Sequence, residues 1–413
     1  MIRTRTPRLA AGAIGCVVML GNRPTTHTHH IELHRRPAAC LLASAASGAA
    51  QRVEHRDDQC GEGEEAGHSG LLGERVSITI GLMTHPATIF PGGDPDAVAQ
   101  CSAMLRGGGL VGMPTETVYG LACDALNPRA VAGVFAAKER PSFDPLIVHI
   151  RDLDHAQTLA VFDATAIKLA QRFWPGPLTL VLPKQTDQAT GEPAVPGLVT
   201  AGLGRVGLRV PAHPVAQAIL RDSGLALAAP SANRFGSISP TTAQHVADEL
   251  AGRVDFILDD GPCSVGVEST IVKVEGENVT LLREGGMPVE MLEEHLGTPV
   301  LRPTRTVAIE SPGQLLTHYA PSLPLRLNAD SANNGEALLA FGPTSLKDAA
   351  LNLSEIGDLS EAARNLFAML KQLDASGATG IAVQSIPKHG LGAAINDRLT
   401  RAAHREEKLE NAE

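Results

Sequence analysis

From residue 95 onward, short apolar segments alternate with helix signals, and this alternation constrains the fold more than any other feature of the 413-residue chain. Helices are predicted where a Pro follows a capping residue, as at Asp94-Pro95 and at Ser239-Pro240, where a helix to about Leu250 is expected. The segments between them favour buried strands, and they include residues 110–113, 146–150, 178–183, 206–210 and 225–229. This alternation predicts an α/β fold, with helices packed on a parallel or mixed sheet.

A second group of elements follows a Pro-rich stretch at residues 301–323, which is interpreted as a linker. Beyond it, LPLRL, EALLAFG and GIAVQSI are predicted strands, and residues 359–373 and 392–403 are predicted helices. The chain is therefore expected to hold one α/β domain at 83–300 and a smaller α/β domain at 324–413, within the usual range of domain sizes.

Residues 1–82 differ in composition from the rest of the chain. They contain no Phe, Trp, Tyr or Lys, and all nine of their cationic side chains are Arg. They also hold six of the 15 His and three of the six Cys. A stretch without aromatic residues can bury little apolar area, so this N-terminal extension is predicted to be mostly disordered.

Three interpretations of the extension compete. One is a targeting peptide, because an apolar run at 9–20 follows three cationic residues, Arg3, Arg5 and Arg8. A second is a metal-binding tract made of four His, namely His27, His29, His30 and His34. No acidic or Cys partner stands at ligand spacing to that tract. We favour the third, an extension without function or a start placed too far upstream, with the working protein beginning near Met83.

The overall composition excludes several classes of protein. The formal net charge is −10 and aromatic residues make up 3%, which disfavours a broad surface for nucleic acid. No apolar run reaches the roughly 18 residues of a membrane span, so no membrane partner is expected. The six Cys form no C-x-x-C pair, which argues against a disulfide framework or a zinc ribbon and predicts a cytoplasmic protein.

Familiar nucleotide motifs are absent or out of context. Gly107, Gly109 and Gly112 have the spacing of a dinucleotide-binding loop, but they follow a predicted helix and precede a strand, the reverse of the required order. They are interpreted as a helix stop. The chain has no P-loop consensus and no G-x-S-x-G segment, which excludes a P-loop and counts against an α/β-hydrolase. Neither a redox cofactor nor a protein-held metal is predicted.

Polar and cationic residues instead gather where predicted strands end, which is where open α/β sheets bind ligands. Thr115, Thr117 and Tyr119 come directly after a strand. Lys138 and Arg140 are two residues apart, so they can converge on one anion. A Lys point charge beside an Arg fork suits a polyphosphate.

Two further clusters consist mainly of small polar residues. Ser231 and Asn233, within APSANRFGSISP, can bind phosphate through a hydroxyl and backbone N–H groups. Ser269 and Thr270 begin one strand, and Arg283 ends the next. Each cluster alone is also compatible with an ordinary turn or a solvated charge. Together, without a catalytic triad, metal ligands or a redox motif, they predict an α/β enzyme that handles phosphates or nucleotides.

Taken in order, these motifs resemble those of the YrdC-type threonylcarbamoyl-AMP synthases, in the long version with an added C-terminal domain. The similarity runs from about residue 94 to residue 403 and rests on PTETVYGL, the K-x-R and PLIVHI stretch, WPGPLTLVL, LRVPAHP, APSAN, GVESTIV, SPG…HYAP and GLGAAINDRLTRAA. It implies a YrdC-like twisted mixed sheet with helices at 83–300, and a smaller Rossmann-like α/β domain at 324–413.

The resemblance also implies a reaction. L-threonine, bicarbonate (or CO2) and ATP would give L-threonylcarbamoyl-AMP and pyrophosphate, with Mg²⁺ accompanying the ATP. A separate tRNA threonylcarbamoyl transferase complex would then modify the adenosine beside the anticodon, and a weak contact with tRNA would fit this role. Fixed cations would supply most of the catalysis, and no protein nucleophile is needed.

The positions that match the family's motifs imply roles for twelve residues. The catalytic constellation around the phosphates would be Lys138, Arg140, Ser231 and Asn233. The same four would bind ATP, together with Ser142, Thr200, Arg283 and Tyr319. The threonine and carbamate side would be lined by Thr115, His149, Arg209 and Ser269. Tyr319 lies in the 301–323 linker, which in long family members folds over the active site as a lid.

Three positions depart from the family's pattern. Ala122-Cys123 stands where Gly-Ala or Gly-Cys is common, Asp144 stands where Asn is common, and Glu284 stands where Pro is frequent. The charge of Asp144, next to the phosphate loop, would weaken anion binding.

Two other functions remain open. An RNA-binding module is disfavoured by the acidic net charge and the scarcity of aromatic residues. A carbamoyl-adenylate enzyme of the hydrogenase-maturation type would carry zinc-finger-like Cys pairs and an acylphosphatase region, and the sequence contains neither.

Deleting residues 1–82 is expected to leave the melting temperature and the rate of pyrophosphate release nearly unchanged, because that stretch lacks a core-forming composition. The test compares residues 83–413 with the full chain by thermal melting and by a pyrophosphate assay. A large loss of stability in the shorter protein would show that the extension packs.

Overall fold

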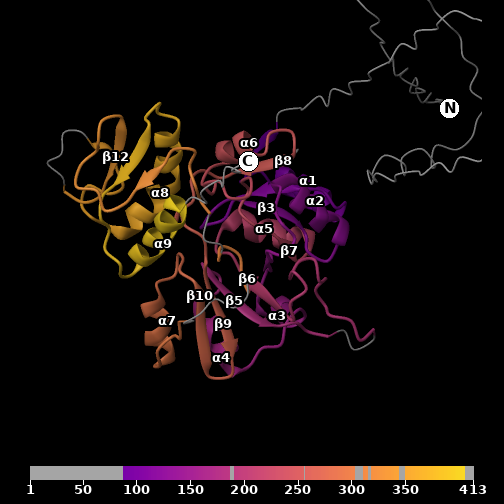
Figure 1. Ribbon diagram of the computed structural model, residues 1–413. Helices are drawn as coiled ribbons and strands as arrows, with labels where there is room; N and C mark the ends of the chain where they lie inside the picture. Colours follow the sequence, from indigo (N-terminus) through magenta and orange to yellow (C-terminus); the bar gives the residue numbers. More distant parts are fainter. Residues whose placement is uncertain are drawn as a thin grey trace, which may run out of the picture. The chain divides into compact units, whose positions relative to one another are not determined.

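The structure is a computed structural model that describes residues 87–186, 190–254, 256–302, 310–314, 318–343 and 349–404 (Figure 1). The expectations of disorder, a targeting peptide or a His tract within residues 1–82 lie outside these residues. Among the described helices, none combines the length and the apolar character that crossing a bilayer would require.

The larger sheet contains ten strands in the described part of the chain. Their bounds are β1 Thr88–Pro91, β2 Val111–Met113, β3 Gly120–Asp124, β4 Ile147–His149, β5 Leu178–Pro183, β6 Arg205–Arg209, β7 Leu227–Ala228, β8 Phe256–Asp259, β9 Thr270–Glu275 and β10 Asn278–Arg283. Their order across the sheet is β1-β8-β2-β3-β7-β4-β6-β5-β9-β10. Four pairs of neighbouring strands are parallel (β1 with β8, β2 with β8, β4 with β6, β5 with β9) and the others are antiparallel, which confirms the mixed sheet.

Seven described helices accompany this sheet: α1 Pro95–Arg106, α2 Pro128–Lys138, α3 Leu153–Gln157, α4 Ala164–Phe173, α5 Pro214–Ser223, α6 Ala243–Glu249 and α7 Val289–Leu296. Capping side chains define where several begin. Asp94, Asn127 and Asp163 each accept a hydrogen bond from a backbone N–H in the first turn of the helix that follows. The helix start predicted from Asp94-Pro95 is thereby confirmed.

The alternation of side chains along the strands divides the apolar core between the two faces of the sheet. In β3, Ala122 packs in the cluster that contains residues of α1 and α5, whereas its neighbours Leu121 and Cys123 pack in the cluster that contains residues of α2, α4 and α6. Phe256 and Ile257 of β8 divide in the same way. Because successive side chains of a strand point to opposite faces, helices cover both faces of the sheet.

One predicted helix start is wrong. The helix expected from Ser239-Pro240 begins at Ala243 instead, with Thr242 as its N-cap. The Ser239 hydroxyl is buried and donates a hydrogen bond to the carboxylate of Glu268, 2.5 Å away, whereas the Thr242 hydroxyl accepts from the His245 N–H and caps the helix. The sequence analysis also missed strands β1 and β3 and helices α3 and α7.

The smaller sheet is parallel throughout its described strands, in the order β11-β14-β12-β13. Its bounds are β11 Leu325–Arg326, β12 Glu336–Ala340, β13 Ala349–Asn352 and β14 Gly380–Val383, and it is accompanied by α8 Leu359–Asp374 and α9 Leu391–Ala403. Figure 1 shows α8 and α9 in yellow beside this sheet. The parallel order with helices confirms the expected Rossmann-like α/β architecture, although β13 was not predicted.

Apolar side chains connect the two sheets. Val118, Ile238 and Val267, from loops of the larger sheet, pack in one cluster with Tyr319 of the linker and Phe367 of α8. The described residues from 87 on accordingly form one compact unit by their contacts. The expected division at residues 300 and 323 stays a prediction.

The approach of the loop before β9 to α8 requires a glycine. Gly266 has φ +81°, and a Cβ there would lie 2.3 Å from the Cα of Arg364. Gly276 also has positive φ, +63°, but a Cβ there would meet nothing within 4 Å.

The variant Gly276→Ala is therefore expected to lower the free energy of unfolding by about 1 kcal/mol, from backbone strain alone. Gly266→Ala should lower it by about 3 kcal/mol, because strain and overpacking add. Urea unfolding of both variants measures the difference. Equal losses of unfolding free energy in the two variants would mean that the 264–268 loop is not packed closely against α8.

Candidate functional site

Loops at the ends of several strands of the larger sheet converge on one narrow pocket with a volume of about 50 Å³. Its wall is formed by the loop between β2 and β3, the ends of β4, β6 and β10, the residues after β7 and before β9, and linker residues 312–313 and 318–319. Eight of the twelve predicted site residues line it: Thr115, Arg140, His149, Arg209, Ser231, Ser269, Arg283 and Tyr319.

Arg209, at the end of β6, forms one corner of the pocket with the loop that precedes β3. Its guanidinium lies 2.7 Å from the Glu116 carboxylate and donates hydrogen bonds to the Thr117 hydroxyl at 2.9 Å and to the Gly176 carbonyl oxygen. The Thr115 hydroxyl donates to the Val118 carbonyl oxygen at 2.6 Å, which holds the loop in a tight turn. These three contacts place an oxygen opposite the Arg209 guanidinium in three directions, and so they fix its orientation.

His149, at the end of β4, contributes a neutral imidazole to the same wall. Burial, followed by the charge of Arg209, lowers the pKa of His149 to about 3. Its Nδ1 atom is buried and has no hydrogen-bond partner among the described residues. A neutral, unpaired ring nitrogen at the surface of a pocket is available to a ligand.

Arg140 lines the pocket and is paired with Asp144. The guanidinium lies 2.9 Å from that carboxylate and also donates to the backbone carbonyl oxygens of Asp144 and Pro145. The two side chains are 4% and 1% exposed, so this is a buried ion pair. Burial raises the pKa of Asp144, against the opposing effect of Arg140. Asp144, whose charge was expected to weaken anion binding, thus contacts Arg140 directly, and its effect on anion binding stays a prediction.

Arg283, at the end of β10, reaches the residue that precedes β9. Its guanidinium donates to the backbone oxygen of Ser269 at 2.8 Å, to the hydroxyl of the same residue at 3.2 Å, and to the Pro312 carbonyl oxygen of the linker. The Ser269 hydroxyl also lies 2.8 Å from that of Thr179 on β5. This network joins three strand ends and the linker at the pocket.

Lys138 lies behind the wall rather than in it. It is the last residue of α2, and the next residue, Glu139, turns the chain with φ +55°. The ammonium is buried and donates to the backbone oxygens of Ser231 and Asn233. Burial, followed by the charge of Arg140, lowers the pKa of Lys138 well below its usual value. The structure thus joins this lysine to the S-x-N segment through its backbone, and not to the pocket surface.

The other three predicted ATP residues also lie outside the pocket lining. The Asn233 amide donates to the carbonyl oxygens of Arg234 and Ser237, which braces the loop after β7. Ser142 is exposed on the loop after α2. Thr200 lines a separate small cavity together with linker residues 310–312.

The linker closes the pocket with two aromatic side chains, His318 and Tyr319. Tyr319 is 1% exposed and has a positive φ of +63°, and its ring stacks on that of Phe367 at a centroid distance of 5.7 Å. A non-glycine residue held in this conformation is a strained feature of the kind that clusters at functional sites. Burial, followed by the charges of Arg140 and Lys138, lowers the pKa of His318 well below its usual value.

Sequence reasoning missed Glu116, whose carboxylate pairs with the pocket residue Arg209, and two residues of the pocket wall, Glu268 and His318. Each lies inside a motif that was recognised, PTETVYGL, GVESTIV or HYAP. For Glu116 and Glu268, the available signal was a carboxylate inside a segment predicted to be buried, since a buried carboxylate needs a cationic partner.

Two family models match the chain and together span most of the described residues. The model described as telomere recombination, for the Sua5, YciO and YrdC proteins, matches residues 103–285. The model described as the threonylcarbamoyl-AMP synthase C-terminal domain matches residues 287–404.

Curated relatives agree over almost their whole length. A threonylcarbamoyl-AMP synthase of Bacillus subtilis is 39% identical over 348 residues, covering 79% of this chain and 96% of the relative. One of Pyrococcus abyssi is 38% identical over 323 residues, covering 73% of this chain and 92% of the relative.

A solved structure agrees as well. The P. abyssi Sua5 protein in complex with L-threonine has a TM-score of 0.68 and 36% identity, covering 75% of this chain and 95% of that one. The chain therefore belongs to the Sua5/YrdC family of threonylcarbamoyl-AMP synthases, in the form that carries the C-terminal domain.

Proposed function

We propose that the protein forms L-threonylcarbamoyl-AMP and pyrophosphate from L-threonine, bicarbonate or CO2, and ATP. Its product would serve a separate tRNA threonylcarbamoyl transferase complex in the cytoplasm. Three described cysteines, Cys101, Cys123 and Cys263, are buried free thiols, which is compatible with a reducing compartment.

One observation carries this proposal, namely that two buried cationic side chains in the described part of the chain form no ion pair with a carboxylate. Among the described residues, Arg140 and Arg209 form ion pairs with carboxylates. Lys138 and Arg283, in contrast, donate only to carbonyl and hydroxyl oxygens. A buried charge without a counterion is costly, so the site is suited to a ligand that brings negative charge, as a nucleotide triphosphate does.

Other residues of the pocket suit an amino acid and its carbamate. Thr115, Ser269 and the neutral ring of His149 offer hydrogen-bonding groups without charge, while Arg209 offers a guanidinium for a carboxylate. The P. abyssi relative has been solved in complex with L-threonine, which supports threonine as the amino acid here.

The chemistry requires positioning and charge stabilisation more than a protein nucleophile. The threonine amine attacks the carbon of CO2 and loses a proton, which gives a carbamate. A carbamate oxygen then attacks the α-phosphorus of ATP, and a new P–O bond forms as the bond to the oxygen that bridges to the β-phosphorus breaks. Pyrophosphate leaves with the charge of that oxygen, which Arg140, Arg283 and, through the S-x-N backbone, Lys138 are placed to stabilise.

Mg²⁺ would enter with the nucleotide as MgATP. In the described part of the chain, no group of three or more His, Cys, Asp or Glu side chains is arranged to hold a metal ion. The nearby carboxylates of Glu116, Asp144 and Glu268 are already paired with arginines. When bound, the ion would neutralise phosphate charge, so that the protein's cations have less charge to stabilise.

The linker would act as a lid. A volume of about 50 Å³ is far below the roughly 300 Å³ of a typical ligand pocket, so the wall formed by residues 312–313 and 318–319 must move to admit substrates. Closure would then keep water from the mixed anhydride product, which hydrolyses easily. Tyr319, buried between the pocket and Phe367, is the residue whose displacement would open it.

Replacing Lys138 or Arg140 by Ala is expected to lower threonine-dependent pyrophosphate release at least tenfold, which corresponds to about 1.4 kcal/mol of transition-state stabilisation. Release from ATP in the presence of bicarbonate, Mg²⁺ and threonine measures the effect. Arg151→Ala is the matched control, because that side chain is 41% exposed and pairs only with its neighbour Asp152. Wild-type rates for both Lys138→Ala and Arg140→Ala would refute the phosphate role.

The buried, neutral His149 also predicts a difference in acid stability. Its folded pKa of about 3 lies below the ordinary value of 6.5, so it contributes stability that is fully present above pH 6.5 and is lost as the pH falls toward 3. His149→Gln should therefore lose about 2 kcal/mol less stability than the wild type between pH 7 and pH 5. Urea unfolding across that range measures it, and parallel curves for the two proteins would contradict a neutral His149.

A further inference from the structure

One buried arginine of the C-terminal part contacts the wall of the pocket. Arg398, on α9, is 0% exposed. Its guanidinium lies 2.8 Å from the Glu268 carboxylate, donates to the Glu284 carbonyl oxygen at 2.9 Å, and pairs with the neighbouring Asp397 at 2.6 Å. Its centre lies 5.0 Å from the centroid of the Tyr319 ring.

Three of these contacts reach a segment that carries a site residue. Glu268 lines the pocket itself and directly precedes Ser269. Glu284 directly follows Arg283. Tyr319 is the linker residue that closes the pocket. Three wall segments that are distant in the sequence therefore meet at one guanidinium.

Stability alone does not account for this arrangement. A buried ion pair gains little over apolar side chains of the same volume, because both charges must leave water. What an arginine adds is a planar fork with fixed donor directions, which a lysine or an apolar residue cannot reproduce. The second carboxylate oxygen of Glu268 accepts from the Ser239 hydroxyl, so Glu268 is held from both sides.

We propose that Arg398 is a positioning residue, which acts through Glu268 to hold Ser269 in the geometry that binds threonine and its carbamate. The pocket of the larger sheet is then complete only when α9 is docked against it. This inference rests on the proposed function, because it takes the 268–269 wall as part of the threonine side.

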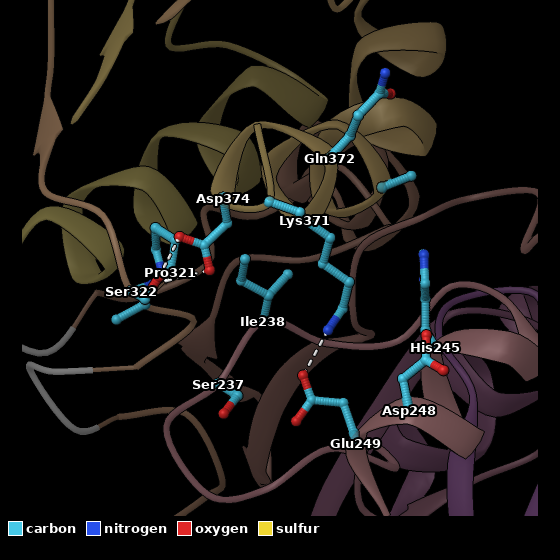
Figure 2. A pocket seen from close by; sticks show the side chains of 13 residues that line it. Ser237, Ile238, His245, Asp248, Glu249, Pro321, Ser322, Lys371, Gln372 and Asp374 are labelled. Carbon is cyan, nitrogen blue, oxygen red and sulfur yellow. Dashed lines mark hydrogen bonds and ion pairs between the residues drawn. The ribbon is translucent and has the colours of Figure 1, made fainter. Parts of the chain in front are cut away.

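A second contact between the same parts of the chain provides a matched control. Lys371 of α8 pairs with Glu249 of α6 at 2.6 Å, with side chains 17% and 19% exposed. Figure 2 shows this pair among the side chains that line a groove, together with Asp374 and Ser322. The groove has a volume of about 820 Å³. None of the residues that line the groove lines the pocket of the predicted site. Removing Lys371 therefore tests docking in general, without touching the wall.

The experiment uses the full chain and four variants: Arg398→Lys, Arg398→Met, the double variant Arg398→Met with Glu268→Gln, and Lys371→Met. The double variant leaves no buried carboxylate unpaired, so it is available if Arg398→Met does not fold. For each protein, steady-state pyrophosphate release gives KM separately for threonine and for ATP, calorimetry measures threonine binding without turnover, and thermal melting reports folding.

We expect Arg398→Lys to melt close to the wild type and yet to raise the KM and the Kd for threonine about tenfold, with KM for ATP changed less than about twofold. Lys371→Met should leave both KM values near those of the wild type. Unchanged threonine binding in folded Arg398 variants would overturn the proposal, and so would an equal loss in Lys371→Met, which would indicate docking alone. If the wild type binds threonine but releases no pyrophosphate, the proposed function fails while the binding comparison still tests Arg398.

Discussion

The proposed site depends on two cationic side chains that, in the part of the chain that the structure describes, are buried without an ion pair to a carboxylate. Lys138 and Arg283 lose most of their hydration, and their hydrogen bonds go to carbonyl and hydroxyl oxygens. Their field extends to the neighbours, because burial together with Arg140, Lys138, Arg398 and Arg283 keeps His318 neutral. A fold that buries such side chains against neutral oxygens is preorganised for an anion, and this is the condition under which electrostatic catalysis needs no reorganisation at the moment of reaction.

The C-terminal part contributes to this site directly. Tyr319 of the linker packs against Phe367 of α8 on one side and closes the pocket on the other. Arg398 of α9 reaches Glu268, and Gly266 allows the same loop to approach α8. The loop before β9 thus contacts both α8 and α9, so a change in how the C-terminal part docks would shift the position of Ser269. This arrangement gives a physical reason for a second domain in an enzyme whose predicted catalytic residues lie in the first.

Local features of the sequence predicted most of the regular structure. The cap at Asp94 and the Pro that follows it placed the start of α1 closely. The prediction failed at Ser239, because the helix is capped three residues later by Thr242 and the Ser239 side chain contacts Glu268, 29 residues away. It could not find the partners of Arg209 and Arg398, which lie 92 and 130 residues away in the chain. Nor could spacing show that Lys138 turns toward carbonyl oxygens behind the wall, while Arg140 reaches the pocket.

The most direct test of the central claim is to identify the product. The full chain is incubated with ATP, Mg²⁺, bicarbonate and either threonine, serine or alanine, and the nucleotides are analysed by mass spectrometry alongside the pyrophosphate released. With threonine, we expect threonylcarbamoyl-AMP and pyrophosphate in equal amounts, and with serine or alanine we expect far less product. ATP turnover that does not depend on an amino acid, or an adenylate that lacks the carbamoyl group, would contradict this expectation.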